Sequence, residues 1–283
     1  MKRCSLIAVC WLLAGSAAQA GDIASNLVGH WALQDNAAST TVVATVGTGG
    51  TLTNSGNTSA SSVTGPGGSY PLALSLDGTN DFIDVTTGNT AAFQNVGAWT
   101  IAAWIKTTAT TVTIASASTT SAGGFRAGIS ISTGTFSASS RSNNAGSLYG
   151  RATVATYNDG NWHHVAGVVD IANDTIDLYV DGSLIASTTL TNGTIAWTTS
   201  ATANDASAAV RIGQYNSGSY FNGSLADMRF YQRELVAADI SDLYALGSAT
   251  GNGLVYPQII GSLIRPTPWS RFLAQTPIAM EAR

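Results

Sequence analysis

Beyond its first 20 residues this chain has no cysteine and almost no glutamate or lysine. Cys4 and Cys10 both fall in that N-terminal stretch, so the remainder has no thiol for a disulfide, a metal site or a nucleophile. The only glutamates are Glu234 and Glu281, and the only lysine beyond residue 20 is Lys106. Disulfide-stapled folds, thiol chemistry and sites built from paired glutamates are therefore excluded.

The first 20 residues have the organisation of a secretory signal peptide. Lys2 and Arg3 give a charged start, residues 6–14 form a short apolar run, and residues 18–20 read Ala-Gln-Ala, which fits a cleavage site. We therefore expect the mature protein to be secreted, periplasmic or held at the cell surface. We expect it to consist of a folded domain over residues 21–248 and a proline-containing, poorly ordered tail over residues 249–283.

Charge and long apolar runs are also scarce. Only 10% of the residues are charged, and loss of Lys2 and Arg3 with the signal peptide leaves ten basic against 16 acidic residues, a net charge of −6. A weakly acidic chain without basic clusters argues against binding to nucleic acid or to anionic membranes. Residues 254–264 are apolar but are interrupted by Pro257, and a membrane-spanning helix needs about 20 residues.

The most strongly patterned stretch runs from residue 161 to residue 182. Residues 162–169 alternate between two faces, which predicts a β-strand. Turn-forming residues at 170–174 separate it from a second run at 175–180, and Asp181-Gly182 predicts a tight turn before a third strand. Further runs of this kind predict an all-β protein with two antiparallel sheets packed as a sandwich. We expect His163 and His164 to point to opposite faces, so that they cannot bind one metal ion together.

Several motifs carry a resemblance to a known family. Residues 162–166 read WHHVA, 178–182 read LYVDG, 72–85 read LALSLDGTNDFIDV, 99–107 read WTIAAWIKT, and 221–246 read FNGSLADMRFYQRELVAADISDLYAL. In these positions the chain resembles LamG-like jellyroll domains, which are relatives of the concanavalin A-like lectins and glucanases. The resemblance implies a two-sheet antiparallel jellyroll sandwich with one short C-terminal helix.

The helix and the loops can be placed along the chain. Apolar residues at i, i+4, i+7 and i+8 spacing predict the helix over residues 236–246. Val236 stands where an N-cap side chain would be, so we expect the helix to depend on packing. Residues 36–70, apart from a short strand at 51–53, and residues 141–151 are rich in turn formers and are predicted to be loops.

The sequence lacks a catalytic pattern. Glycosidases among the implied relatives carry E-x-D-x-E on one strand, and their carboxylates lie about 5–9.5 Å apart across the scissile bond. The nearest substitute, Asp177 and Asp181, would lie about 13 Å apart along a strand. The patterns G-x-S-x-G, H-E-x-x-H and G-x-x-x-x-G-K-[ST] are absent. We therefore predict that the protein is not an enzyme.

Calcium is the one cofactor that the resemblance implies, because LamG-like domains often hold it at a rim of the sandwich. Asp77 and Asp81 flank a tight turn, and Asp227 falls in the strand that the family pattern marks with Asp. Calcium binds carboxylate and carbonyl oxygens, so these aspartates are the candidate metal ligands. The alternative is that Asp77 caps its turn and that Asp227 pairs with an arginine.

Candidate ligand-binding residues are aromatics in polar loops. A sugar presents flat C–H faces and hydroxyls, so its site needs an aromatic plate flanked by polar side chains. The candidates are Tyr149, Arg151, Trp197, Tyr215 and Tyr220; the alternative is that these rings pack their own loops against the sheet. We expect a secreted, non-catalytic module that binds a neutral or weakly charged glycan or mediates adhesion. The alternatives are a structural or protein-interaction domain of an extracellular assembly and a divergent glycoside hydrolase.

Overall fold

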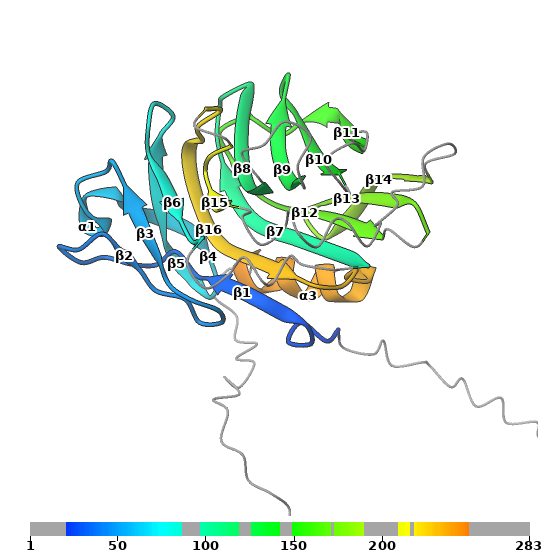
Figure 1. The fold of residues 1–283 in the computed structure, drawn as a ribbon, viewed down its shortest axis with the longest axis horizontal. Helices are drawn as coiled ribbons and strands as arrows, with labels where there is room; N and C mark the ends of the chain where they lie inside the picture. Colours follow the sequence, from blue (N-terminus) through cyan, green and yellow to red (C-terminus); the bar gives the residue numbers. More distant parts are fainter. Residues whose placement is uncertain are drawn as a thin grey trace, which may run out of the picture. The chain divides into compact units, whose positions relative to one another are not determined.

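The computed structural model describes residues 21–86, 97–118, 126–141, 149–170, 173–189, 209–215 and 218–248. The predicted signal peptide, the predicted tail and Trp197 lie outside these residues. Within them the chain is mostly β-structure, arranged as two antiparallel sheets of eight strands each around a common core (Figure 1). The predicted all-β sandwich is confirmed.

Sheet A contains the hairpin that dominates the sequence pattern. Its strand order is β14-β13-β12-β7-β16-β5-β4, and β1 pairs with β16 beside this path. The hairpin is formed by β12 and β13. The strands are β1 (Leu27–Trp31), β4 (Ser62–Gly67), β5 (Tyr70–Asp77), β7 (Ala98–Lys106), β12 (Trp162–Asp170), β13 (Thr175–Val180), β14 (Ser183–Thr189) and β16 (Asn222–Tyr231).

Sheet B faces sheet A across the core. Its strand order is β11-β10-β9-β8-β15-β6-β3-β2, so β8, β9 and β10 lie side by side as a meander. The strands are β2 (Thr41–Val42), β3 (Gly50–Thr53), β6 (Phe82–Asp84), β8 (Thr111–Ser118), β9 (Arg126–Ser132), β10 (Thr135–Arg141), β11 (Tyr149–Thr156) and β15 (Ala209–Ile212).

The loop predictions for residues 36–70 and 141–151 are wrong in part. The first segment contributes β2, β4 and a one-turn helix, α1 (Thr58–Ser61), and β11 begins within the second. These strands have few apolar residues, so they lack the hydrophobic alternation by which a strand is recognised in a sequence. Pairing with a neighbouring strand, which is a tertiary interaction, makes them strands.

Strand β7 is buried on both faces, as its nearly continuous apolar sequence predicts. Trp99 and Ile101 point into the core between the sheets, whereas Ala102 and Trp104 point away from it toward helix α3 (Ala237–Ser248). Burying one large aliphatic side chain stabilises a fold by about 1.5–3 kcal/mol. Strand β7 therefore links the two apolar layers of the domain.

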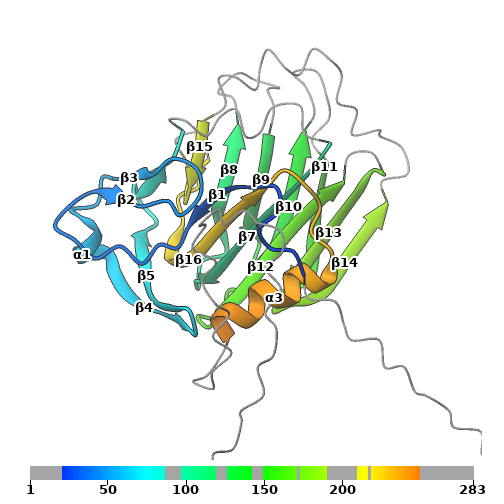
Figure 2. The same ribbon diagram turned by 90° about the horizontal axis from the view of Figure 1, so that it is seen from below.

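Helix α3 covers the outer face of sheet A, whereas no described helix covers the outer face of sheet B (Figure 2). Ile240 and Leu243 pack onto sheet A. The start of the helix is stabilised by Asp239, whose carboxylate accepts the N–H of Val236 at 3.2 Å and pairs with Arg233 at 2.8 Å. A carboxylate in the first turn thus supplies the cap that the sequence at position 236 lacks. Neither described helix is long and apolar enough to cross a membrane.

Strand β16 changes partners at Asp227. Residues 222–225 pair with β5 and residues 228–231 pair with β1, while the register against β7 shifts between Ala226 and Arg229. Asp227 has a φ of 50°, a left-handed conformation that is uncommon outside glycine and occurs at bulges. The bulge therefore marks the point where one side of sheet A passes from β5 to β1.

The carboxylate of Asp227 is buried and ion-paired. Its Oδ1 lies 2.8 Å from Arg229 Nε and 2.8 Å from His30 Nε2. Arg229 Nη2 in turn donates to the hydroxyl of Tyr70 at 2.9 Å. Burial alone would raise the pKa of Asp227, but Arg229 and His30 hold this pKa well below its usual range. The cluster connects β1, β5 and β16.

The adjacent residues His163 and His164 point to opposite faces, and their pKa values shift in opposite directions. His163 Nδ1 lies 2.8 Å from Asp181 Oδ2, and this hydrogen bond raises the pKa of His163. His164 is fully buried beside Trp104 and Tyr244, with ring centroids 5.5 and 6.4 Å away. Neither ring nitrogen of His164 has a hydrogen-bond partner among the described residues, and burial lowers its pKa to about 4.

The outermost strands of both sheets are irregular or short. The pairing register shifts within β4, β11 and β14, and β2 has only two residues. Val154 and Ile185 lie at two of these irregularities and are exposed. Bulged or short edges present no flat row of free N–H and C=O groups, so they resist pairing with a strand of another chain.

We expect Arg229→Met to lower the free energy of unfolding by about 3–5 kcal/mol, because it leaves the buried carboxylate of Asp227 without its main counter-charge. The double variant Asp227→Asn/Arg229→Met should recover part of this loss, because it removes the orphaned charge. Urea denaturation of both variants measures the two values. A double variant no more stable than Arg229→Met would contradict a dominant role for the charge.

We expect His164→Phe to reduce the loss of stability on acidification. In the unfolded chain His164 titrates near pH 6.5, and in the fold its pKa is about 4. The unfolded state therefore binds the proton first, and wild-type stability falls by about 2–3 kcal/mol as the pH drops through this window. Phenylalanine has a similar shape and no nitrogen left without a partner. Urea denaturation at about pH 7 and pH 4.5 measures the difference.

The matched control is His163→Gln. The pKa of His163 is raised, so its contribution is present below its unfolded pKa and is lost as the pH rises through its folded pKa. This variant should keep the acid-dependent loss that His164 causes. If His164→Phe loses as much stability as the wild type between the two pH values, the burial argument is wrong.

Candidate functional site

The outer face of sheet B, which no described helix covers, carries small polar side chains on adjacent strands. In β9, Ile129 faces the core while Gly128 and Ser130 face outward, because successive side chains of a strand alternate. Strand β10 alternates in the same way, with Ser137 and Ser139 outward. Ser130 lies opposite Ser137, and their hydroxyl oxygens are 2.9 Å apart. Residues 128–130 of β9 and 137–139 of β10 therefore offer uncharged donors and acceptors on this face.

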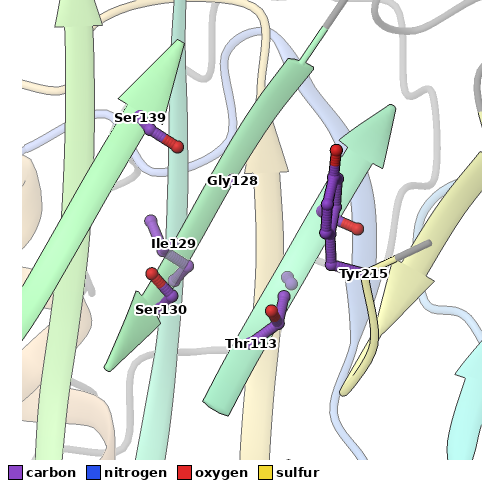
Figure 3. A pocket seen from close by; sticks show the side chains of 8 residues that line it. Thr113, Gly128, Ile129, Ser130, Ser139 and Tyr215 are labelled. Carbon is purple, nitrogen blue, oxygen red and sulfur yellow. The ribbon is translucent and has the colours of Figure 1, made fainter. Parts of the chain in front are cut away.

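A shallow depression of about 130 Å³ opens on this face (Figure 3). It is smaller than the roughly 300–1,000 Å³ of pockets that enclose a drug-sized ligand, so it suits one ring of a larger molecule. No charged side chain contributes to its wall. The lining residues are Thr113, Ala115, Ser116, Gly128, Ile129, Ser130, Ser139 and Tyr215.

Tyr215 stands at the rim of this depression, on the segment that follows β15 (Figure 3). Gly213 turns the chain with a φ of 83°, and a side chain there would collide with Leu76 Cδ1. The N–H of Gly213 donates to the carbonyl of Ile114 on β8 at 2.8 Å. Tyr215 and Gly218 exchange main-chain hydrogen bonds of 3.1 and 2.8 Å. The backbone under the tyrosine ring is thus fixed to sheet B.

A second group of side chains lies beside the depression, around Arg211 of β15. Its guanidinium carbon is 5.3 Å from the centre of the Phe82 ring, and its Nη1 donates to Gln214 Oε1 at 2.6 Å. The Tyr220 ring packs against Phe82 at 6.4 Å. Arg211 lies opposite Ser116 in the β15–β8 ladder, so both side chains are on the outer face.

Two of the five predicted ligand-binding residues lie at the depression or in the group of side chains around Arg211. Tyr215 lines the depression, and Tyr220 belongs to the aromatic group beside it. Arg151 lies opposite a core-facing alanine of β10, so its side chain is on the inner side of the edge strand and away from the depression. Tyr149 begins β11, but its side chain and Trp197 lie outside the described residues. The ligand role of these residues stays a prediction.

Sequence reasoning missed the hydroxyl residues of the lining. Thr113, Ser116, Ser130 and Ser139 come from three strands. A signal was available, because residues 128–139 place serine or glycine between apolar residues at a period of two. The sequence alone could not show that β8, β9 and β10 present these residues side by side.

Asp77 caps its turn, which was the alternative to a role as a calcium ligand. Its Oδ1 accepts the N–H groups of residues 79–81 at 2.7, 3.1 and 3.2 Å, which lowers the pKa of Asp77. Asp81 accepts the N–H of Asp77 at 3.3 Å, and burial together with the charge of Asp77 raises the pKa of Asp81. Each carboxylate keeps one oxygen outside these hydrogen bonds.

Asp227 does not join Asp77 and Asp81. Asn222 is the partner of Asp77 in the β16–β5 ladder, and Asp227 lies five residues, or about 16 Å, further along β16. Its carboxylate faces Arg229 and His30. Among the described residues, no three His, Asp or Glu side chains are grouped so that they could hold a metal ion. Calcium at Asp77 and Asp81 stays a prediction.

Of the two carboxylates considered for hydrolysis, Asp181 is engaged in other contacts, whereas Asp177 Oδ1 is buried without a hydrogen-bond partner among the described residues. Asp181 accepts the main-chain N–H of His164 at 2.9 Å and pairs with His163. Burial and a hydrogen bond to Asp170 raise the pKa of Glu234.

Among the described residues, a helix covers one face of the two-sheet antiparallel sandwich and hydroxyl side chains line the other, which is the arrangement of a lectin-like β-sandwich. The chain belongs to the concanavalin A-like lectin/glucanases superfamily, whose family model matches residues 77–241, more than half of the chain. The resemblance stated from the motifs is confirmed. A search of curated proteins found no match.

Solved structures share this fold at low sequence identity. Domain 4 of AbnA, a GH43 extracellular arabinanase from Geobacillus stearothermophilus in complex with arabinotriose, is 20% identical with a TM-score of 0.55, covering 77% of this chain and 98% of that one. The CBM40 of a Ruminococcus gnavus IT-sialidase, bound to α2,3-sialyllactose, is 17% identical with a TM-score of 0.50, covering 61% and 96%. The binding domain of botulinum neurotoxin serotype D/C is 14% identical with a TM-score of 0.53, covering 80% and 53%. These likenesses show the fold alone.

Proposed function

We propose that this chain is an exported, non-catalytic module that binds a glycan on the outer face of sheet B. The depression on that face carries the proposal, since it is uncharged, lined with hydroxyls, and bordered by Tyr215. Serine hydroxyls such as those of Ser130 and Ser139 can exchange hydrogen bonds with sugar hydroxyls. The tyrosine ring can pack against the apolar C–H face of a sugar.

Structures of the same fold support a glycan as the class of ligand. Domain 4 of AbnA was solved with arabinotriose and the CBM40 with sialyllactose. Entry of botulinum neurotoxin type C into cells depends on interaction with two ganglioside molecules. Those ligands belong to those proteins, and they support the proposal here because a related sandwich holds sugars in each case.

The proposed role does not require catalysis. Strands β8, β9 and β10, which form the depression, carry no Asp or Glu. Hydrolysis of a glycosidic bond ordinarily needs two carboxyl groups on opposite sides of the bond. A shallow, solvated surface gives few buried contacts, so we expect a dissociation constant near the millimolar range, about −4 kcal/mol.

The alternative is a protein-interaction domain. The binding domain of botulinum neurotoxin D/C was solved in complex with rat synaptotagmin II. In this chain the irregular edges of both sheets disfavour one common route to such binding, the addition of a partner strand.

A calcium ion at the turn of residues 77–81 forms a separate part of the proposal. Asp77 and Asp81 each offer one free oxygen, and main-chain carbonyls or water would have to complete a shell of six to eight ligands. With so few protein ligands, we expect weak calcium binding, with a dissociation constant of about 0.1–1 mM as in extracellular modules.

For the glycan site, we expect Ser130→Trp to abolish binding, because the indole would fill the depression. Tyr215→Ala should weaken binding about two- to tenfold through loss of the ring contact. Isothermal titration with arabinotriose, cellobiose, lactose and α2,3-sialyllactose measures both effects.

The matched control is Ser132→Trp, which places the same indole on the same strand and face but outside the depression. This variant should bind like the wild type. Equal binding by Ser130→Trp and the wild type would contradict the site. Absence of binding by the wild type across a broad glycan panel would favour the protein-interaction alternative.

For calcium, we expect about 5 mM CaCl₂ to raise the melting temperature by about 2–9 °C through binding to the folded state. Asp77→Asn should remove this rise while its remaining amide oxygen keeps the turn capped. Asp159→Asn, in another loop where the carboxylate also accepts a main-chain N–H, serves as the control. An identical melting curve in calcium and in chelator would show that this turn binds no calcium.

A further inference from the structure

Arg211 differs from Arg229 and Arg233, two arginines for which the structure shows an ion pair. Arg229 is paired with Asp227, and Arg233 is paired with Asp239. Arg211 forms no ion pair within 4 Å among the described residues, and its Nε is buried without a hydrogen-bond partner. An arginine that is fixed in place and lacks a counter-charge is a ready partner for a carboxylate.

The guanidinium of Arg211 is held in place before any ligand arrives. The Phe82 ring supports it at 5.3 Å, and Gln214 Oε1 accepts one of its N–H groups at 2.6 Å. A planar guanidinium has five N–H donors, so several remain for a ligand. Since stacking and the amide already restrict the side chain, binding would cost little further conformational entropy.

Arg211 lies beside the depression, on the strand next to β8. Arg211 is opposite Ser116, a lining residue, across one strand spacing of about 4.8 Å. Its guanidinium lies over Phe82 on β6, the next strand outward, so the cation is about two strand spacings, or 10 Å, from β8. Gln214 and Tyr215 are consecutive, so one short segment fixes both the cation and the rim of the depression.

We infer that Arg211 forms an anion subsite beside the depression, and that the glycan bound on this face carries a carboxylate on the sugar next to the one in the depression. This inference rests on the proposed function and adds the chemical class of the ligand. The depression takes an uncharged ring, because no charged side chain lines it. The adjacent acidic sugar places its carboxylate on the guanidinium.

The surrounding acidic residues favour a glycan with a single acidic sugar over a glycan with many closely spaced charges. Asp84 is the ladder partner of Arg211 on β6, and its Oδ1 accepts the N–H of Thr86 at 2.9 Å. The mature chain also has a net charge of −6 once Lys2 and Arg3 are removed with the signal peptide. A densely charged polyanion would be repelled by this field, whereas a single carboxylate that contacts the Arg211 guanidinium gains more from this cation than it loses to Asp84 and the other acids.

The test compares acidic and neutral sugars that are otherwise matched. The pairs are α2,3-sialyllactose with lactose and cellobiouronic acid with cellobiose, titrated into the wild type at low ionic strength. We expect the acidic member to bind about fivefold more tightly in at least one pair, and which pair does so distinguishes a sialic from a uronic acid. This preference should disappear at about 1 M NaCl, where the screening length is about 3 Å.

Two variants should move the preference in opposite directions. Arg211→Gln should bring the ratio of the two affinities in each pair close to one, whereas Asp84→Asn should increase the preference by removing the nearest acid. Lys106→Gln is the control, since it removes the same charge from the exposed end of β7 in sheet A. The measured quantity is the ratio of the two dissociation constants in each pair.

The outcomes separate the two levels of the proposal. Equal affinity for acidic and neutral sugars in the wild type, or an acid preference that survives in Arg211→Gln, overturns the anion subsite and leaves glycan binding intact. An equal loss in Lys106→Gln and Arg211→Gln also overturns it, because general charge would then be the cause. Absence of binding to all four sugars and to a wider glycan panel overturns the proposed function itself.

Discussion

The buried ion pair between Asp227 and Arg229 is the interaction on which sheet A depends. A carboxylate is stable in a fold interior only when a counter-charge and hydrogen bonds replace its hydration. Here the bulge at Asp227 sets the carboxylate against Arg229 and His30, which ties β1 to β16 just where β16 leaves β5. Strand β1 joins sheet A through its pairing with β16, and Leu27 of β1 packs against the cluster that contains Ile240 and Leu243 of α3.

The covering of sheet A by α3 explains why the candidate site lies on sheet B. The outer face of sheet A uses its aromatic residues for packing, since Trp104, Tyr179 and Tyr231 are buried there. Small outward residues on β8 to β10 leave sheet B without an apolar face that a helix could cover. The aromatic ring at the depression, that of Tyr215, comes instead from the segment after β15. Gly213 and the main-chain hydrogen bonds around Tyr215 hold this segment in place.

Much of the fold could be predicted because its central strands alternate or are apolar throughout. The hairpin around His164 and the two-sided burial of β7 follow from the pattern directly. The short strands in the segments predicted as loops could not be found, because pairing and not side-chain pattern makes them strands. Asp227 shows a second limit: the sequence gives an acidic residue in a known motif, but a one-residue bulge decides whether it faces solvent, a metal or an arginine. Arg151 shows the same limit, since register alone decides that its side chain lies opposite a core-facing alanine of β10, and its ligand role stays a prediction.

The first described residues contact the last helix. The N–H of Gly21 donates to Asp242 at 2.8 Å, and that of Asp22 donates to Asp239 at 2.7 Å. Helix α3 lies on the outer face of sheet A, on the side of the sandwich opposite the depression. Both ends of the domain therefore adjoin the face that the proposed ligand does not use. The domain could be fused, coupled to a solid support or circularly permuted at these ends, and an array of tethered copies would still present every depression outward.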